Sequence, residues 1–530
     1  MSSPALEVMG EGPDLTADAM RRHYALAGRL IVACGFLLAA TVYALGSGGA
    51  AAPMLALAAG FGGYMALNIG ANDVANNIGP AVGARVIPLG AALMMAAVCE
   101  AAGALIAGGE VVGTIRSGII APSLIGSTDT YVWAMLAALL AAALWLNLAT
   151  ALGAPVSTTH AIVGGVLGAG MAAAGTDIVH WRVTGEIVAS WIISPLMGAG
   201  LAAGCLYLVK RSITWQPDLI AAARRGVPLL AAGMTAAFVA YLALKGLARV
   251  IALPPSVALL AGLIAGLMAW ALMRAHIERH AAGLESSKAG VNSLLGVPLV
   301  LAAGALSFAH GSNDVANAIG PLAGIVDALQ SGDFHTAASV PAWVMALGAI
   351  GLAIGLLTFG PRVIRTVGGE LTSLDALRAC CIALSATVTV IIASQLGLPV
   401  STTHVTVGAL LGVGYLRAAL KARHAVVLAE IRALHPEGER AAAEAFIARF
   451  HAAPFGARKP MLADLKARNR AGLPADLDKP ARKALARAHK RDIVNRRLML
   501  RIAAAWVVTV PASAVMGALL FFTLRGMLLP

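Results

Sequence analysis

The sequence predicts an all-α integral membrane protein with about 12–13 transmembrane spans, built as two inverted-topology repeats with broken or re-entrant helices. Three observations predict this class: an apolar composition, a series of long apolar runs, and two polar motifs that each occur twice. The chain is 59% hydrophobic and 12% charged, with a mean hydropathy of +0.81. Because an average soluble domain is roughly 25% charged, the composition excludes an ordinary soluble domain.

Long apolar runs supply the predicted spans, since a helix needs roughly 20 apolar residues to cross the hydrocarbon core. The clear runs are Leu26–Leu45, Ala52–Ile69, Ala91–Ala107, Val132–Leu152, Ile187–Val209, Val227–Leu247, Ala252–Met273, Leu295–Phe308, Trp343–Gly360, Ala376–Leu398 and Ile502–Leu524. They are rich in Ala and Gly, which let helix backbones approach closely in lipid. A tight polytopic bundle follows.

Two polar motifs recur in the same order in both halves of the chain. GANDVANNIGPAVGA (Gly70–Ala84) matches GSNDVANAIGPLAGI (Gly311–Ile325) at ten of fifteen positions. GAPVSTTHAIVGGVLG (Gly153–Gly168) matches GLPVSTTHVTVGALLG (Gly397–Gly412) at eleven of sixteen. These matches indicate an internal duplication.

Basic residues predict how the halves are oriented. Between positions 421 and 501, 19 Lys and Arg face 8 Asp and Glu, which accounts for most of the net charge of +13. The positive-inside rule places this segment, and the basic residues between the halves, in the cytoplasm. The last spans of the two halves then cross in opposite directions, which predicts inverted repeats. Because the excess charge lies in one loop between spans, membrane lipid is an expected partner and nucleic acid is not.

The chain is therefore divided into six segments. They are 1–48, an N-terminal cytoplasmic segment with an extra span; 49–210, the first transport repeat; 211–294, connecting helices and a cytoplasmic loop; 295–420, the first part of the second repeat; 421–501, a basic cytoplasmic insertion; and 502–530, the last span of the second repeat. Early acidic residues argue against a secretory signal peptide. We expect a multi-pass protein of a bacterial-type inner membrane, with a cytoplasmic N-terminus and an external C-terminus.

The NDVAN motifs place Asp73 and Asp314 inside apolar segments, where a charged group is costly and is a functional candidate by default. Neighbouring amides at Asn72, Asn76, Asn313 and Asn317 make each site rich in oxygen, as a cation or proton site requires. The alternative is a structural hydrogen bond between helices. The Gly-Pro step after each motif, at Pro80 and Pro321, is expected to break a helix and expose carbonyl groups.

The STTH motifs instead favour an anion. Ser157, Thr158 and Thr159, with Ser401, Thr402 and Thr403, follow a Pro-Val step and precede apolar helix, which predicts an N-cap at each site. Free N–H groups, the helix dipole and hydroxyl donors would together enclose a tetrahedral oxyanion. The alternative is that these side chains only cap or join transmembrane helices.

Four further polar residues lie in or beside the predicted spans. His160 and His404, which end the STTH motifs, are read either as structural hydrogen-bond partners or as proton relays. Glu100 and Gln395 have apolar counterparts in the other half, Leu352 and Ala151. Glu100 is read as a coupling group or a structural partner, and Gln395 as lining one side of the site.

The paired motifs GANDVANNIGP…PVSTTH and GSNDVANAIGP…PVSTTH resemble the inorganic phosphate transporter (Pit) family. The resemblance implies an inverted-repeat symporter that carries inorganic phosphate with Na⁺ or H⁺, in some bacterial members as a metal-phosphate complex. It also implies that the six STT residues hold phosphate. Asp73, Asn76, Asp314 and Asn317 would hold the coupling cation, with Na⁺ a candidate at the two aspartates, and no other cofactor is expected.

Other functions are weighed against this one. A sulfate or other oxyanion permease would have the same fold, an anion channel would not accumulate its substrate, and a membrane phosphotransferase would release a product. Neither STTH copy has a nucleophile elbow, so an enzyme is not expected. A homodimer through the Gly-rich helix faces is a further expectation.

Overall fold

The computed structural model describes residues 15–47, 49–151, 156–246, 253–331, 340–368, 374–433 and 496–528. Within these ranges the chain is almost entirely helical, with one isolated β-bridge between Ile120 and Val179. Eleven of the described helices are long and apolar enough to span a membrane, and the bent pair Lys288–Leu294 and Gly296–Ser331 brings the number to twelve. The all-α membrane class is confirmed, with the span number at the lower end of the predicted range.

The helices of the first half and of the connecting region are α1 (Leu15–Ser47), α2 (Ala52–Gly83), α3 (Leu89–Ala107), α4 (Gly109–Gly113), α5 (Thr128–Ala151), α6 (Thr158–Ala174), α7 (Trp181–Val209), α8 (Leu219–Tyr241) and α9 (Pro255–His280). Those of the second half are α10 (Lys288–Leu294), α11 (Gly296–Asp314), α12 (Ala316–Ser331), α13 (Ala342–Gly368), α14 (Ala376–Gln395), α15 (Thr402–Ala433) and α19 (Arg496–Leu528). Short 3₁₀ and π turns join several of them.

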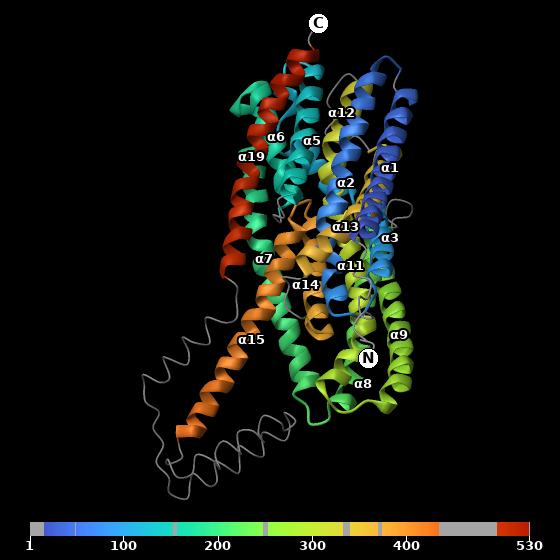
Figure 1. Cartoon of the computed structure of the whole chain (residues 1–530), viewed down its shortest axis with the longest axis vertical. Helices are drawn as coiled ribbons and strands as arrows, with labels where there is room; N and C mark the ends of the chain where they lie inside the picture. Colours follow the sequence, from blue (N-terminus) through green and yellow to red (C-terminus); the bar gives the residue numbers. More distant parts are fainter. Residues whose placement is uncertain are drawn as a thin grey trace, which may run out of the picture.

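Helices of the two halves pack on each other rather than forming separate bundles. The α2 helix packs against α13, and α3 packs against α11. The exchange is reciprocal at the STTH helices, since α6 of the first half packs against α19 and α15 of the second half packs against α7. In Figure 1, α5, α6, α7 and α19 stand beside a second group that contains α1, α2, α3 and α13. Each group therefore combines both halves of the sequence.

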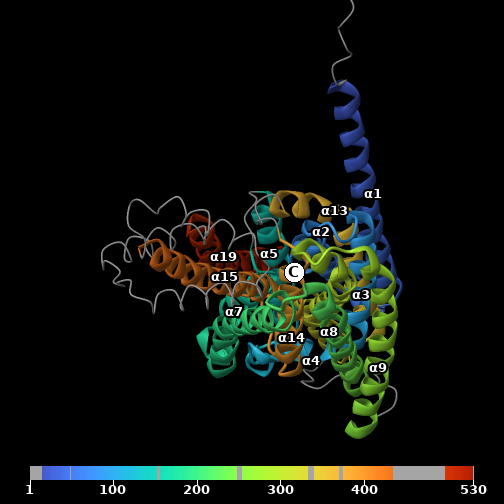
Figure 2. The same ribbon diagram turned by 90° about the horizontal axis from the view of Figure 1, so that it is seen from below.

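The two STTH helices leave the middle of the molecule in opposite directions. In Figure 1, α6 extends toward the upper end, beside the C-terminus, and α15 extends toward the lower end. Figure 2, seen from below, shows α15 and α19 projecting together to one side of the bundle. The opposite directions of α6 and α15 are consistent with the inverted arrangement predicted from the charges.

The predicted helix break at each Gly-Pro step is wrong. Pro80 lies inside α2 and Pro321 inside α12, and both helices continue past the proline. A proline removes one backbone hydrogen bond, which a packed membrane helix tolerates because neighbouring groups satisfy the freed carbonyl. The interruption lies instead at Val315, directly after Asp314, where α11 ends and α12 begins.

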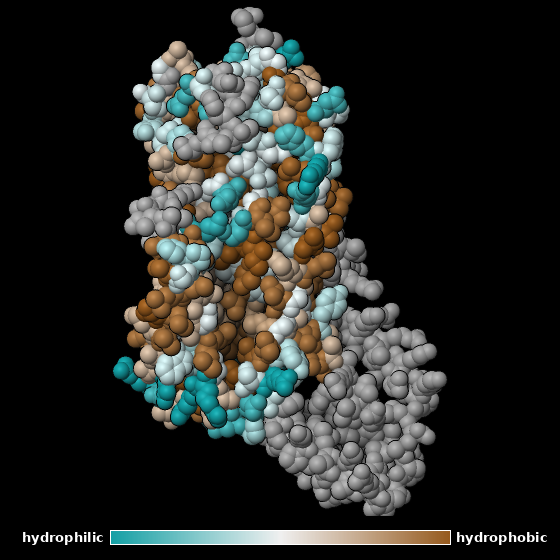
Figure 3. Space-filling view, turned by 180° about the vertical axis from the view of Figure 1, so that it is seen from behind, coloured by the Kyte–Doolittle hydropathy of each residue, from teal (hydrophilic) through white to brown (hydrophobic). Residues whose placement is uncertain are grey.

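Much of the outer surface is apolar. Figure 3 shows hydrophobic side chains over most of the visible face, with hydrophilic ones gathered at the lower end and in smaller groups at mid-height and at the upper end. Along α9, for example, Leu259, Leu263 and Leu267 are more than half exposed. Exposed leucines on a long apolar helix suit contact with lipid tails. Most of the predicted basic insertion, residues 434–495, lies outside the described residues.

Candidate functional site

The two STTH motifs meet near the centre of the molecule, each at the start of its helix. The Ser157 hydroxyl accepts a hydrogen bond from the His160 amide at 3.2 Å, and the Ser401 hydroxyl accepts one from the His404 amide at 3.3 Å. Both serines are therefore N-caps, as the sequence predicts. The Thr159 hydroxyl donates to the Val400 carbonyl at 3.0 Å, so the motifs contact each other directly.

The threonines of both motifs converge on the two NDVAN aspartates. The Thr158 hydroxyl donates to Asp73 Oδ2 at 2.9 Å and lies 3.5 Å from Asp314 Oδ2. Thr402 donates to Asp314 Oδ2 at 3.2 Å, and Thr403 donates to Asp73 Oδ1 at 3.2 Å. All five residues are buried. The structure thus brings the predicted anion-binding and cation-binding residues into one cluster.

Asparagines of the NDVAN motifs hold these threonines and also the extended residues that precede each STTH helix, which we call the STTH entries. Asn317 donates to the Thr159 hydroxyl at 3.1 Å, and Asn76 donates to the Thr403 hydroxyl. Asn72 donates to the Val156 carbonyl at 3.2 Å.

Asn313 makes two hydrogen bonds to the entry of the second STTH helix. Its amide nitrogen donates to the Leu398 carbonyl, and its oxygen accepts from the Val400 amide, each at 3.2 Å. The amides therefore hold both STTH entries beside the aspartates.

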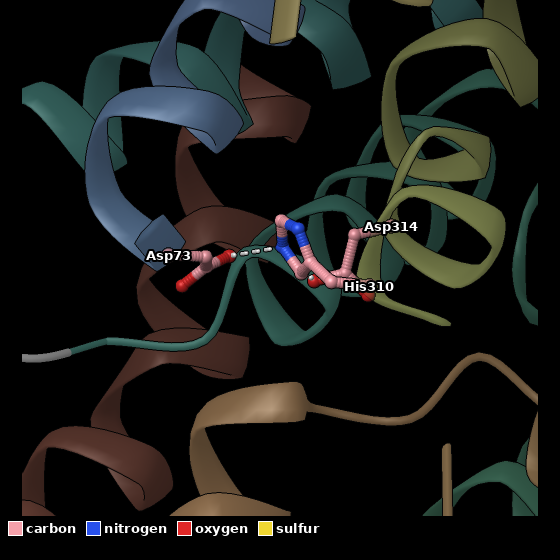
Figure 4. A group of neighbouring side chains, drawn as sticks. All are labelled: Asp73, His310 and Asp314. Carbon is pink, nitrogen blue, oxygen red and sulfur yellow. Dashed lines mark ion pairs between the residues drawn. The ribbon is translucent and has the colours of Figure 1, made fainter. Parts of the chain in front are cut away.

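A residue that the sequence analysis missed lies at the centre of the cluster. His310, on α11, is fully buried and points at both aspartates, as Figure 4 shows. Its Nε2 atom lies 3.1 Å from Asp314 Oδ2 and 3.7 Å from Asp73 Oδ2, while its Nδ1 atom lies 3.1 Å from Glu100 Oε1. The imidazole therefore links three buried carboxyl groups.

Glu100 reaches this cluster because α3 and α11 touch at their backbones. A Cβ atom on Gly311 would collide with the Glu100 carbonyl, and one on Gly103 would collide with the Phe308 carbonyl. Glycine at both positions lets the helices approach closely. Asn77 of α2 donates to Glu100 Oε1 at 2.7 Å and so orients the carboxylate toward His310.

The histidine could have been found from its spacing. His310 precedes Asp314 by four positions, which places both side chains on one face of α11. The repeat gave no signal, because the equivalent position in the first half is Ile69. An isolated histidine in an apolar run is otherwise not distinctive.

The centre of the cluster has the composition of a cation or proton site. One ligand atom from each of Asp73, His310 and Asp314 lies within 4.8 Å of the others. Carboxylate and hydroxyl oxygens are suitable ligands for a hard cation such as Na⁺, and an imidazole between carboxylates can equally carry a proton. Asp314 Oδ1 has no hydrogen-bond partner among the described residues, so it is available to a ligand.

Three other predicted residues lie away from the aspartates. The rings of His160 and His404 pack against each other at a tilt, with centroids 4.5 Å apart, and the His160 ring packs against Trp191 of α7, also tilted, with centroids 3.8 Å apart. This pair of rings is a second direct contact between the two STTH motifs. Gln395 donates to the Tyr241 hydroxyl of α8 at 3.3 Å, so its recorded contact is with the connecting helices and not with the cluster.

Comparisons with known proteins agree with this arrangement. A model of the phosphate transporter family matches residues 69–517. A Helicobacter pylori protein, provisionally named a phosphate permease, is 46% identical over 505 residues, which is 94% of this chain and 95% of that protein. A Pyrococcus abyssi protein with the same provisional name is 40% identical over 69% of this chain and 89% of its own length.

One solved structure has the same fold. It is described as the sodium-dependent phosphate transporter, and it aligns with a TM-score of 0.73 and 28% identity. The alignment covers 90% of this chain and all of that one.

Proposed function

The chain belongs to the phosphate transporter family, and from this premise we propose that it imports inorganic phosphate across the inner membrane by symport with H⁺ or Na⁺. The relatives named as permeases and the structural neighbour named as sodium-dependent support phosphate as the substrate and a cation as the driving partner. The reciprocal packing of the two halves supports a transporter in which one group of helices moves against the other.

One observation carries the proposal: the threonines of both STTH motifs share hydrogen bonds with two buried aspartates. A phosphate anion at these threonines would lie beside Asp73, Asp314 and the nearby Glu100. Like charges in a buried site repel strongly. A cation that neutralises the aspartates removes this repulsion and frees threonine hydroxyls to donate to phosphate, so anion and cation must bind together.

The proposed roles follow from these contacts. Ser157, Thr158, Thr159 and their equivalents Ser401, Thr402 and Thr403 hold phosphate with the helix N–H groups behind them. Asp73, Asn76, Asp314 and Asn317 hold the coupling cation. His310 completes this second set, either beside a bound Na⁺ or as the carrier of the coupling proton, and Glu100 orients it.

The orientation in the membrane is part of the proposal. The C-terminus lies at the upper end of the molecule in Figure 1, and the turn between α7 and α8 lies at the lower end. Arg274 and Arg279 lie at that lower end of α9. The positive-inside rule therefore supports a cytoplasmic lower end and an external C-terminus.

The test is uptake of radiolabelled phosphate into proteoliposomes under an imposed Na⁺ gradient or an imposed pH gradient. Concentrative uptake under one of them is expected and identifies the ion. Asp73→Asn and Asp314→Asn should abolish it, whereas Asp129→Asn, at an exposed position in the first turn of α5, should not.

Each rival function predicts a different result. Sulfate accumulation without phosphate accumulation would identify a sulfate permease, equilibration without accumulation would identify a channel, and release of a phosphorylated or hydrolysed product would identify an enzyme. Full coupled uptake by both aspartate variants would refute the proposed cation site.

A further inference from the structure

A polar stripe runs from Asp73 back toward the N-terminal end of α2, which lies at the same end of the molecule as the C-terminus of the chain (Figure 1). Tyr64, Asn68 and Asn72 recur every four residues and so share one face of α2. Asn147 of α5 donates to the Tyr64 hydroxyl and, at 2.7 Å, to Asn68 Oδ1. Asn72 in turn donates to Asp73 Oδ1 at 3.0 Å. Polar contacts thus follow α2 from Tyr64 to the aspartate, a distance of about 14 Å along the helix.

The stripe is accessible from outside the protein. Asn147 is exposed, and the side chains of Tyr64, Asn68 and Asn72 are partly exposed. All four lie within helices whose length and hydropathy suit a membrane span. An amide that faces hydrocarbon is costly, so a water-filled passage is the environment that fits these residues.

The second half of the chain has no such stripe. The equivalents of Tyr64 and Asn68 are Ala305 and Ala309, and the equivalent of Asn147 is Ile391. The repeat therefore does not explain the polar residues as a common structural need of both halves.

Equivalent residues also differ in exposure between the halves. Thr150 lies 3.5 Å from Asn72 and is exposed, whereas the equivalent pair, Ser394 and Asn313, is fully buried. The first pair therefore reaches the surface of the protein, and the second pair does not. Polar side chains are thus at least partly exposed along the stripe as far as Asn72, whereas the equivalent pair on the symmetry-related side is buried.

The chemistry of the stripe favours a cation over phosphate. The Asn147 amide nitrogen donates to its two neighbours, and the Asn68 amide nitrogen donates to the Tyr64 carbonyl at 2.8 Å. These contacts use N–H donors that phosphate would need. The Asn147 side-chain carbonyl belongs to an exposed residue, and the Tyr64 hydroxyl to a partly exposed one. Oxygens of this kind are ligands for a hard cation.

We propose that Tyr64, Asn68 and Asn147 form an outer subsite through which the coupling cation reaches Asp73. This inference rests on the proposed function, since it names the path taken by the driving ion. In the proposed topology the path opens on the external side, as import requires. The subsite contains no charged group, so it binds the cation weakly and passes it on to the aspartates.

The test compares two substitutions at the exposed Asn147, measured as the cation concentration that gives half-maximal phosphate uptake. Asn147→Leu removes the oxygen and should raise this concentration about fivefold, the effect of losing one polar contact. Asn147→Asp adds a negative charge and should lower it by a similar factor. The KM for phosphate at saturating cation should be unchanged in both. Leu144→Ala, at another exposed position of α5, is the control.

The outcomes separate this inference from the proposed function. No concentrative uptake by the unmodified protein refutes the function itself. Normal uptake with an unchanged cation requirement in both variants refutes only the subsite. An increased phosphate KM in Asn147→Asp, with the cation requirement unchanged, would make the stripe a path for the anion and also overturn the inference. If Asn147→Leu fails to fold, Asn147→Asp alone decides by the sign of its effect.

Discussion

Asn76 of α2 donates a 2.7 Å hydrogen bond to the Thr403 hydroxyl, 327 positions further along the chain. The equivalent asparagine of the second half, Asn317, donates to Thr159 of the first. Each NDVAN motif therefore holds the STTH motif of the other half. The residues proposed to bind the cation and those proposed to bind phosphate are joined by these hydrogen bonds, so occupation of one set is expected to change the hydrogen bonds available to the other.

Asn76 and Thr403 are expected to act as a unit in transport. Asn76→Ala and Thr403→Val should each raise the KM for phosphate about fivefold, the effect of one lost hydrogen bond. The double variant should cost little more than either single variant, because both remove the same contact. Kinetics of phosphate uptake measure the cycle, with Thr523→Val as a control because its hydroxyl bonds only within α19. Strictly additive effects would show that the contact is not used.

Removal of His310 should destabilise the protein. His310→Gln leaves Asp73, Glu100 and Asp314 buried beside a neutral group, and an uncompensated buried charge typically costs about 3–5 kcal/mol. The expected result is a marked fall in the midpoint of thermal unfolding in detergent. Adding Glu100→Gln removes one of the opposed charges and should restore part of the loss. His280→Gln, at an exposed position, should leave the midpoint unchanged. Equal stability of His310→Gln and the unmodified protein would show that His310 does not neutralise the buried carboxylates.

A substitution that separates α3 from α11 should impair the protein as much as a substitution in the central cluster. Gly311→Ala places a methyl group against the Glu100 carbonyl, and such overpacking costs about 1–3 kcal/mol. The helices must separate, which moves Glu100 away from His310, so both thermal stability and phosphate uptake should fall. Gly185→Ala in α7 meets nothing within 4 Å and should be neutral or slightly stabilising. A Gly311→Ala variant with normal uptake would show that the spacing of these helices is not critical.

The sequence was sufficient for the membrane class, for most spans and for the residues that gather in the centre. Long apolar runs determine helices in lipid almost by themselves, and a motif that occurs twice identifies buried polar residues such as Asp73 and Asp314 without a structure. The structure also confirms the serine caps, because capping depends on local sequence.

The missed features depend on contacts between distant segments. His310 has no equivalent in the repeat. Its spacing to Asp314 places both on one face of α11, but its contact with Glu100 of α3, 210 positions earlier, could not be read from the sequence. The Gly-Pro breaks were wrong because neighbouring helices, not local propensity, decide whether a proline interrupts a membrane helix. Gln395 has no charged partner nearby in sequence, and its contact with Tyr241 on a connecting helix could not be read from the motif.

The histidines of the STTH motifs provide the last prediction. The His160 ring packs against Trp191 in a tilted arrangement, and its Nδ1 atom has no hydrogen-bond partner among the described residues. This environment suits packing better than proton transfer, so His160→Phe, which keeps an aromatic ring, should retain coupled uptake. Trp191→Phe should be the more costly change, because it removes the 3.0 Å hydrogen bond from the indole nitrogen to the Pro399 carbonyl, which ties α7 to the second STTH entry. We expect about a fivefold loss in phosphate affinity for Trp191→Phe. Uptake under Na⁺ and pH gradients distinguishes the two roles: if His160→Phe loses pH-driven uptake while remaining folded, the histidine relays protons and the packing role is wrong.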